Sequence, residues 1–319
     1  MNTNRIENIL NSRIRDFSLF SVLPGSLSGI IEKTVKEANI SLDDIEEVRI
    51  RLKSGIVLIC NNQRLRLNIN IDEKYLNDIL NYFTGYSYYA YENQLRAGYL
   101  TLPGGHRVGV AGTCVMNENR IKSIDHITSL NIRQAREFKG IAKDLIHHII
   151  FYDKSNDKLN DNSNNKYKDK NIQAMLHNTL IISPPKAGKT TMLRDLIRLL
   201  SNEGFIAGVI DERQEISGKG NTEFAFDLGR NTDVLTSCSK SEGFRILLRS
   251  MSPDFIATDE LAVSDFNLLE EAKTFGIPVI ATIHGNIKGE LPCVIKDYFS
   301  CLVYLGDNPT PATILEICK

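Results

Sequence analysis

Apolar residues recur at two different spacings in the first half of the chain. Near residues 48–52 and 65–67 they alternate with polar residues, Ile56 and Leu58 keep the same spacing of two, and turn-forming residues separate these runs. That alternation predicts antiparallel strands joined by tight turns. Apolar residues at helical spacing in residues 6–17 and 76–83 predict two amphipathic helices. We therefore expect a small α+β domain in this part of the chain.

A tyrosine-rich stretch follows the second of these helices. It contains four tyrosines in six residues: Tyr86, Tyr88, Tyr89 and Tyr91. Aromatic rings of this kind can stack on nucleic-acid bases, but no basic residues surround them here. We expect a half-buried packing cluster instead, followed by a hairpin with a glycine-rich tip over residues 99–112.

The second half of the chain alternates between short apolar runs and helical patterns. Four of the runs have the length of buried strands: residues 180–183, 204–210, 255–258 and 279–283. This alternation is typical of a mostly parallel sheet flanked by helices. Among the helices, we expect one that is capped by Ser241.

Composition changes sharply between the two halves. Residues 153–170 consist mostly of Asn, Asp, Lys and Ser. Such a stretch cannot bury enough apolar surface to offset the entropy lost on ordering. We predict an α+β N-terminal domain with a linker at residues 1–150, a flexible polar insertion at 151–172, and an α/β domain at 173–319.

Overall charge and cysteine spacing narrow the classes of function. A net charge of −1 over 319 residues gives no electrostatic footprint for tight nucleic-acid binding, and no nucleic-acid partner is expected. The six cysteines include no C-x-x-C pair, which indicates reduced thiols rather than a zinc or redox site. No apolar run approaches the ~20 residues that span a bilayer. We expect a cytoplasmic protein that reaches a membrane only through partners.

The most informative stretch is residues 180–191. It combines a short apolar strand, a loop of small residues, Gly-Lys-Thr and the start of a helical pattern. In such a loop, backbone N–H groups and the helix N-terminus face one concavity, which suits the phosphates of ATP. Lys189 would reach the β- and γ-phosphates, and the Thr190 hydroxyl would bind Mg²⁺. The predicted nucleotide-binding residues are Ser183, Pro184, Pro185, Lys186, Ala187, Gly188, Lys189, Thr190 and Thr191.

The loop departs from the G-x-x-x-x-G-K-[ST] pattern at one position, where Ser183 stands in place of the first glycine. If that position requires a positive φ, serine is strained there. If it requires only a small side chain, serine fits.

Three strands after the loop end in polar or charged residues, at Asp211-Glu212-Arg213, Asp259-Glu260 and His284. Because the carboxyl ends of parallel strands line one crevice, we expect these groups to converge on the phosphates. Asp259 would orient Mg²⁺, and Glu260 would polarise a water for attack on the γ-phosphate. His284 would contact the γ-phosphate through a ring N–H or rest against a backbone carbonyl.

Negative charge that develops on the phosphoryl oxygens is best stabilised by an arginine. The candidates are Arg107, Arg133, Arg136, Arg213, Arg230 and Arg249. Spacing alone does not choose among them.

Several sequence blocks together resemble one family. The blocks are residues 95–99, 103–109, 129–133, 182–191, 209–213, 249–254 and 281–285. In residue type and order, they resemble the stage III sporulation protein AA family, which belongs to the secretion ATPase superfamily of type II and type IV systems. The resemblance covers about residues 45–305.

This resemblance implies a RecA-like P-loop ATPase core behind the smaller α+β domain, assembled as a ring, usually a hexamer, with the nucleotide between the two domains. It implies a Walker A box at 183–191, an Asp box at 211–213, Walker B carboxylates at 259–260 and a His box at 284. It further implies that Glu212 and His284 support the site and that Arg107 and Arg133 contact phosphates.

The implied role is to energise the channel between mother cell and forespore, from the mother-cell cytoplasm, with membrane proteins of that channel as partners. Two other functions stay open. One is a RecA-like motor that translocates nucleic acid, against which the near-zero net charge argues. The other is a non-motor assembly protein that binds ATP as a structural switch.

Overall fold

The computed structural model describes residues 18–61, 63–118, 120–152, 174–218, 226–285, 293–307 and 311–319. The chain divides into two compact units, Met1–Arg136 with Gly218–Ala225 and Glu137–Ser217 with Phe226–Lys319. The predicted helix over residues 6–17 lies outside the described residues, as does the predicted polar insertion from residue 153 onward.

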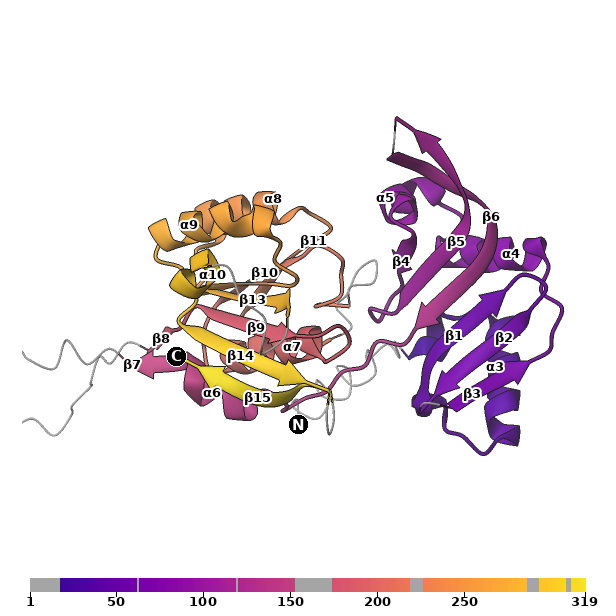
Figure 1. Ribbon diagram of the computed structural model, residues 1–319, viewed down its shortest axis with the longest axis horizontal. Coiled ribbons are helices and arrows are strands. Elements are labelled where there is room, and N and C mark those ends of the chain that lie inside the picture. The colour runs from indigo at the N-terminus through magenta and orange to yellow at the C-terminus, as the bar shows by residue number, and fades with distance from the viewer. Residues whose placement is uncertain are drawn as a thin grey trace, which may run out of the picture. The chain divides into compact units, whose positions relative to one another are not determined.

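The N-terminal unit is built on an antiparallel sheet (Figure 1). Its strands are β1 (Ile45–Arg51), β2 (Gly55–Cys60), β3 (Gln63–Leu67), β4 (Tyr99–Thr101), β5 (Arg107–Asn117) and β6 (Arg120–Arg133). Its helices are α2 (Leu19–Val22), α3 (Gly25–Glu37), α4 (Glu73–Phe83) and α5 (Glu92–Arg96), with the short 3-10 helices η1 (Leu42–Asp44) and η2 (Tyr88–Tyr91). Among the described residues the strand order is β3-β2-β1-β6-β5-β4. The antiparallel strands and the helix predicted near residues 76–83 are confirmed.

One apolar core holds this unit together. In β2, Ile56, Leu58 and Cys60 are buried at every second position, as expected for a strand with one face on a core. Helix α4 adds side chains at helical spacing: Leu76, Ile79, Leu80 and Phe83. These residues form one cluster with Leu27, Ile31 and Val35 of α3.

The tyrosine-rich stretch differs from the predicted packing cluster. Tyr86 and Tyr89 expose 78% and 90% of their surface, whereas Tyr91 packs against the core. The cause is local, because Gly85 and Tyr86 both take positive φ and turn the chain after α4. The prediction is therefore wrong for Tyr86 and Tyr89.

The second unit is an α/β structure. Its strands are β7 (Ile150–Tyr152), β8 (Ala174–Leu176), β9 (Thr179–Ser183), β10 (Ala207–Asp211), β11 (Thr232–Thr236), β12 (Phe255–Thr258), β13 (Val279–His284), β14 (Cys301–Gly306) and β15 (Thr313–Cys318). Its helices are α6 (Lys143–Ile149), α7 (Lys189–Asn202), α8 (Lys240–Ile246), α9 (Phe266–Thr274) and α10 (Cys293–Tyr298), with the π-helical turn η4 (Leu247–Met251) and the 3-10 turn η5 (Val263–Asp265). In the described part, the main sheet has the order β11-β10-β12-β13-β9-β14-β15, and β7 pairs with β8.

The main sheet is parallel except for β15, which forms an antiparallel hairpin with β14. Successive residues of its strands face opposite sides. In β9, Ile181 joins a core with α6 and α7, whereas Leu180 and Ile182 join a second core with α8, α9 and α10. Figure 1 shows these helices on the two sides of the sheet. The predicted sheet flanked by helices is confirmed.

The boundary between the units differs from the predicted domain end at residue 150. It lies at Arg136, and helix α6 belongs to the second unit. Leu145 of α6 is buried in the core with α7, and the Ala142 N–H donates to Asp195 Oδ2 on α7 at 2.9 Å. These contacts are tertiary, so local composition does not reveal them.

Helix α8 begins two residues earlier than predicted. Ser239, rather than Ser241, caps it by accepting a hydrogen bond from the Glu242 N–H at 3.4 Å. The two serine hydroxyls lie 3.0 Å apart, so either one satisfies the sequence signal for a cap.

We expect Asp195→Ala to lower the free energy of unfolding by about 2–4 kcal/mol, because a buried N–H and the charged Arg198 both lose their acceptor. Urea unfolding followed by circular dichroism measures this. The control is Asp233→Ala, which removes an exposed carboxylate on β11 and should change stability by less than about 0.5 kcal/mol. Equal stability of the two variants would contradict the anchoring of α6 by Asp195.

Candidate functional site

Four neighbouring parallel strands end at one edge of the main sheet. Strands β10, β12, β13 and β9 lie side by side, and the register places His284 next to Ser183 and Thr258 next to Ala281. The residues that follow β9, β10 and β12 therefore meet the end of β13. The structure brings together the predicted groups at Lys189, Thr190, Asp259, Glu260 and His284, as their contacts below show.

The loop between β9 and α7 resolves the question left by Ser183. Ser183 is buried, its φ is not positive, and its hydroxyl donates to the Pro184 carbonyl at 2.9 Å. The position therefore requires a small side chain and not a glycine. Positive φ occurs instead at Lys186 (67°) and Gly188 (86°). Pro185 and Lys186 are exposed, and Ala187 is buried.

Gly188 is required by a close contact. A Cβ at this residue would lie 2.8 Å from the backbone nitrogen of Ala312, which itself donates to the Ala187 carbonyl at 2.8 Å. The segment before β15 thus braces the loop. Sequence reasoning missed Ala312, because nothing in its local pattern marks it as a neighbour of the loop.

The start of α7 has the features that the predicted phosphate site requires. The first N–H groups of a helix have no partner within the helix and carry partial positive charge. Lys189, the first residue of this helix, is only 6% exposed. Burial lowers the pKa of its ammonium group, and the nearby carboxylates of Asp259 and Glu260 oppose that shift. A buried cation beside helix N–H groups fits a polyphosphate.

Thr190 and Asp259 form an oxygen-rich pair. The Thr190 hydroxyl donates to Asp259 Oδ2 at 2.6 Å, and the Thr282 hydroxyl donates to Oδ1. Mg²⁺ prefers such oxygen ligands and is commonly held by one or two protein groups plus substrate phosphates and water. In the part of the chain that the structure describes, no three His, Cys, Asp or Glu side chains group as a metal site of their own. The residues at Thr190 and Asp259 therefore fit a magnesium ion that is bound together with nucleotide.

His284 lies between Lys189 and Glu260 and contacts both side chains. Lys189 Nζ lies 3.1 Å from His284 Nδ1, and His284 Nε2 lies 3.2 Å from Glu260 Oε1. Because an ammonium group only donates, Nδ1 accepts, and the Nε2–H donates to Glu260. His284 therefore contacts two side chains of the site rather than a backbone carbonyl.

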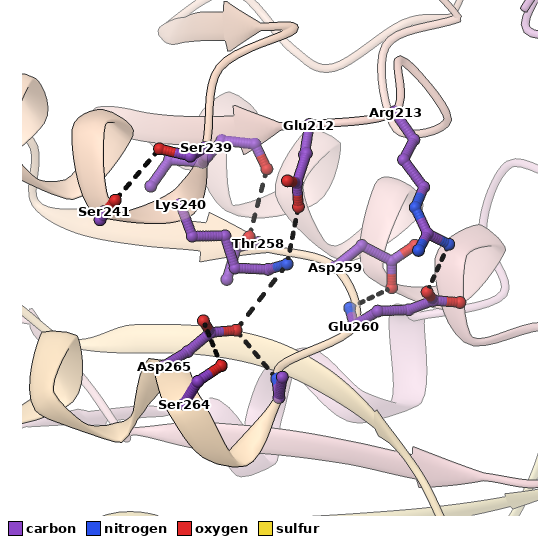
Figure 2. A network of polar contacts seen from close by, with 12 residues as sticks. Glu212, Arg213, Ser239, Lys240, Ser241, Thr258, Asp259, Glu260, Ser264 and Asp265 are labelled. Carbon is purple, nitrogen blue, oxygen red and sulfur yellow. Dashed lines mark hydrogen bonds and ion pairs between the residues drawn. The ribbon is translucent and has the colours of Figure 1, made fainter. Parts of the chain in front are cut away.

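Glu260 is held at its backbone and at its side chain. Its φ is +48°, and its N–H donates to the Thr282 hydroxyl at 2.9 Å. Figure 2 shows the Arg213 guanidinium against its carboxylate, with Arg213 Nη1 2.7 Å from Oε2. Burial opposes ionisation, but the charge of Arg213 and the contact with His284 outweigh it and lower the pKa of Glu260. The carboxylate is therefore ionised at neutral pH.

The two acidic residues that end β10 have different roles. Asp211 is buried and accepts from the Ile216 N–H at 3.1 Å and from the Ser217 N–H and hydroxyl at 2.8 and 2.6 Å. Both of its oxygens thus close the following loop. Glu212 instead points to Lys240 Nζ at 3.0 Å (Figure 2). With Asp259 and Glu260 it lines a small cavity of about 30 Å³.

Arg194 of α7 contacts the loop that follows β10, a role that the sequence analysis did not predict. It is 6% exposed and donates to the Ile216 and Glu215 carbonyls at 2.9 and 2.8 Å, while its guanidinium lies 3.6 Å from the centre of the Phe226 ring. Burial lowers the pKa of Arg194 to about 10, which leaves it charged at neutral pH. From the sequence, it reads as one more polar position on an amphipathic helix.

Arg107 and Arg133 lie in the N-terminal unit. They are register partners on β5 and β6. Arg107 lies 4.8 Å from the centre of the Tyr99 ring, and Arg133 Nε lies 3.2 Å from the buried carboxylate of Glu47. A contact of either arginine with phosphate stays a prediction.

The family model described as "Sporulation stage III, protein AA" matches residues 21–318. The chain belongs to this family. A relative, stage III sporulation protein AA of Bacillus subtilis (strain 168), is 36% identical over 272 residues, which cover 83% of this chain and 80% of the relative. The resemblance inferred from the sequence blocks is confirmed.

A solved structure shares the fold of this stage III sporulation AA family member. The crystal structure of the pilus retraction motor PilT with bound ADP aligns with a TM-score of 0.50 at 12% identity, over 86% of this chain and 76% of that chain. At this identity the likeness concerns the fold alone. It confirms a RecA-like α/β core with a smaller α+β N-terminal domain.

A membrane-spanning helix, long and apolar enough to cross a bilayer, is not found among the residues that the structure describes.

We expect Asp211→Ala to destabilise the protein by about 2–4 kcal/mol, because two buried N–H groups and a hydroxyl lose their acceptor. Ser217→Ala removes only the hydroxyl contact and should cost about 1 kcal/mol. Thermal unfolding of both variants at one pH gives the comparison. A smaller loss in Asp211→Ala than in Ser217→Ala would contradict the role of Asp211 in closing the loop.

Proposed function

We propose that this stage III sporulation AA family member is a Mg²⁺-dependent ATPase that works as a ring, usually a hexamer, and energises the channel between mother cell and forespore. The observation that carries the enzymatic part is the contact between Thr190 and Asp259 at 2.6 Å, beside Lys189 and Glu260 on a RecA-like sheet. These groups come from two different strand-to-loop junctions and meet at the N-terminus of α7.

The proposed chemistry assigns one task to each group. Lys189 and the backbone N–H groups of residues 186–191 hold the phosphates. Thr190 and Asp259 would hold Mg²⁺, which supplies positive charge to the phosphoryl oxygens when it is bound. Glu260 is ionised and accepts a proton from the attacking water. His284 links Lys189 to Glu260, and Glu212 lines the same cavity.

Arg107 and Arg133 are proposed to stabilise the negative charge that develops on the phosphate oxygens. Arg107 and Arg133 face each other as register partners, so one strand pair presents two guanidinium groups. Such groups stabilise charge that develops on phosphate oxygens in the transition state. Family membership and the name of the Bacillus relative support a role in sporulation. The ring, the channel and the mother-cell location are further parts of the proposal.

The first test is steady-state phosphate release from ATP and Mg²⁺ over a range of protein concentrations. We expect specific activity to rise with concentration, because sites completed by assembly depend on mass action. Lys189→Ala should abolish ATP binding, since the phosphates lose their buried cation. Glu260→Gln should bind ATP and lose at least about 100-fold in kcat.

Glu270→Gln is the matched control, because it neutralises an exposed glutamate on α9 and should keep wild-type turnover. Active Glu260→Gln enzyme would overturn the assigned base. Binding of ATP without phosphate release at any concentration would favour a structural switch. Stimulation by single-stranded or duplex DNA would favour a nucleic-acid motor.

We expect Arg133→Ala to lower kcat by at least about 100-fold while the protein stays folded. Folding should survive, because Arg49 also pairs with Glu47, at 2.7 Å, and keeps that buried carboxylate partnered. Arg120→Ala, at the other end of β6, is the control and should leave turnover unchanged. Normal turnover in Arg133→Ala would remove this arginine from the proposed site.

A further inference from the structure

The carboxylate of Glu260 is gripped at both oxygens. Arg213 Nη1 lies 2.7 Å from Oε2, and His284 Nε2 lies 3.2 Å from Oε1. The two groups come from different strand ends, since Arg213 follows β10 and His284 ends β13. Figure 2 shows the Arg213 side chain reaching across from the β10 end to the Glu260 side chain. We call this pair of contacts, from Arg213 and His284, the Glu260 clamp. It links the ends of three neighbouring strands, β10, β12 and β13.

The contacts with Arg213 and His284 restrain the Glu260 side chain, which its fixed backbone leaves free to rotate. The backbone of Glu260 is fixed at a positive φ by Thr282 and Asp259, but the side chain has three rotatable bonds. A free glutamate side chain samples many rotamers, and each bond that is not fixed disperses the carboxylate over several ångströms. Catalytic groups must be held within about 0.5 Å of the productive position. Arg213 and His284 supply that restraint.

The solvent exposure of Arg213 and Glu260 indicates that their contact orients the Glu260 carboxylate rather than stabilises the fold. The side chains of Arg213 and Glu260 are 45% and 34% exposed, so solvent screens their attraction. An ion pair at this exposure contributes little to folding. Its geometry still fixes where the carboxylate points, because a planar guanidinium offers donors in fixed directions.

We propose that Arg213 is a positioning residue, which holds Glu260 in the one orientation that activates the attacking water. This inference rests on the proposed function, in which Glu260 is the base. This role differs from that of an arginine that contacts phosphate, because Arg213 acts through Glu260 and does not bind the nucleotide.

The test is Arg213→Gln in the full-length chain. We expect kcat for ATP to fall at least about tenfold, because a small misplacement of a catalytic group has large effects on rate. KM should stay within about twofold, because the orientation of Glu260 does not hold ATP in the ground state. Arg213→Lys should recover part of kcat. Arg245→Gln, which removes another arginine paired with an exposed glutamate, should behave as wild type.

A double-mutant cycle assigns the effect to Glu260. Glu260→Asp shortens the side chain and withdraws it from Arg213, so adding Arg213→Gln to it should lower kcat by less than about twofold. An independent tenfold loss in that background would overturn the proposal, as would a raised KM, which indicates contact with phosphate. An increase of kcat in Arg213→Gln would also overturn it, because the arginine would then restrain the base.

One readout does not depend on turnover. In crystal structures of the wild type and of Arg213→Gln, the Glu260 side chain should occupy one rotamer in the first and several in the second. A single shared rotamer would overturn the clamp. Absence of phosphate release by the wild type would instead overturn the proposed function, and the rotamer comparison would still decide whether Arg213 positions Glu260.

Discussion

The order of four parallel strands is the constraint on which the site depends. Because β12 and β13 lie between β10 and β9, the groups that follow these strands are presented at one edge, a few ångströms apart. No single local motif could place the Thr190 hydroxyl at 2.6 Å from Asp259, since these residues are far apart in the chain and meet only through strand pairing. The phosphate loop, the acidic residues and His284 are thus one consequence of sheet topology.

Burial separates the contacts that stabilise the site from those that orient it. Asp211 and Arg194 are almost fully buried, and each satisfies several backbone groups of the loop after β10. Buried polar groups of this kind are costly to leave unpaired, so Asp211 and Arg194 hold residues 215–217 of this loop in place. Arg213 and Glu260 sit closer to solvent, where an ion pair adds little stability but can still fix a direction.

Some of the residues with a strained backbone lie around the same edge. Lys186, Gln214, Glu260 and Ala312 are non-glycine residues with positive φ, and they lie in the phosphate loop, in the loop after β10, after β12 and beside the phosphate loop. Each such residue costs about 1–2 kcal/mol, which the surrounding contacts must offset. Positive φ also occurs in turns of the N-terminal unit, for example at Asn39, Lys53 and His126, so strain by itself does not mark the site.

The sequence by itself determined most strands of this protein and the residue types of its candidate site. Hydrophobic spacing located most strands of both units and helix α4, and the Gly-Lys-Thr loop and the acidic strand ends predicted a nucleotide site, because these signals are local. Tertiary structure decided what local patterns cannot carry: that α6 belongs with α7, that Tyr86 and Tyr89 face solvent, and that Arg194 is buried under a loop. It also decided that Arg213 grips Glu260. These contacts join residues distant in the chain, and their energies depend on burial and direction that appear only once the sheet has formed.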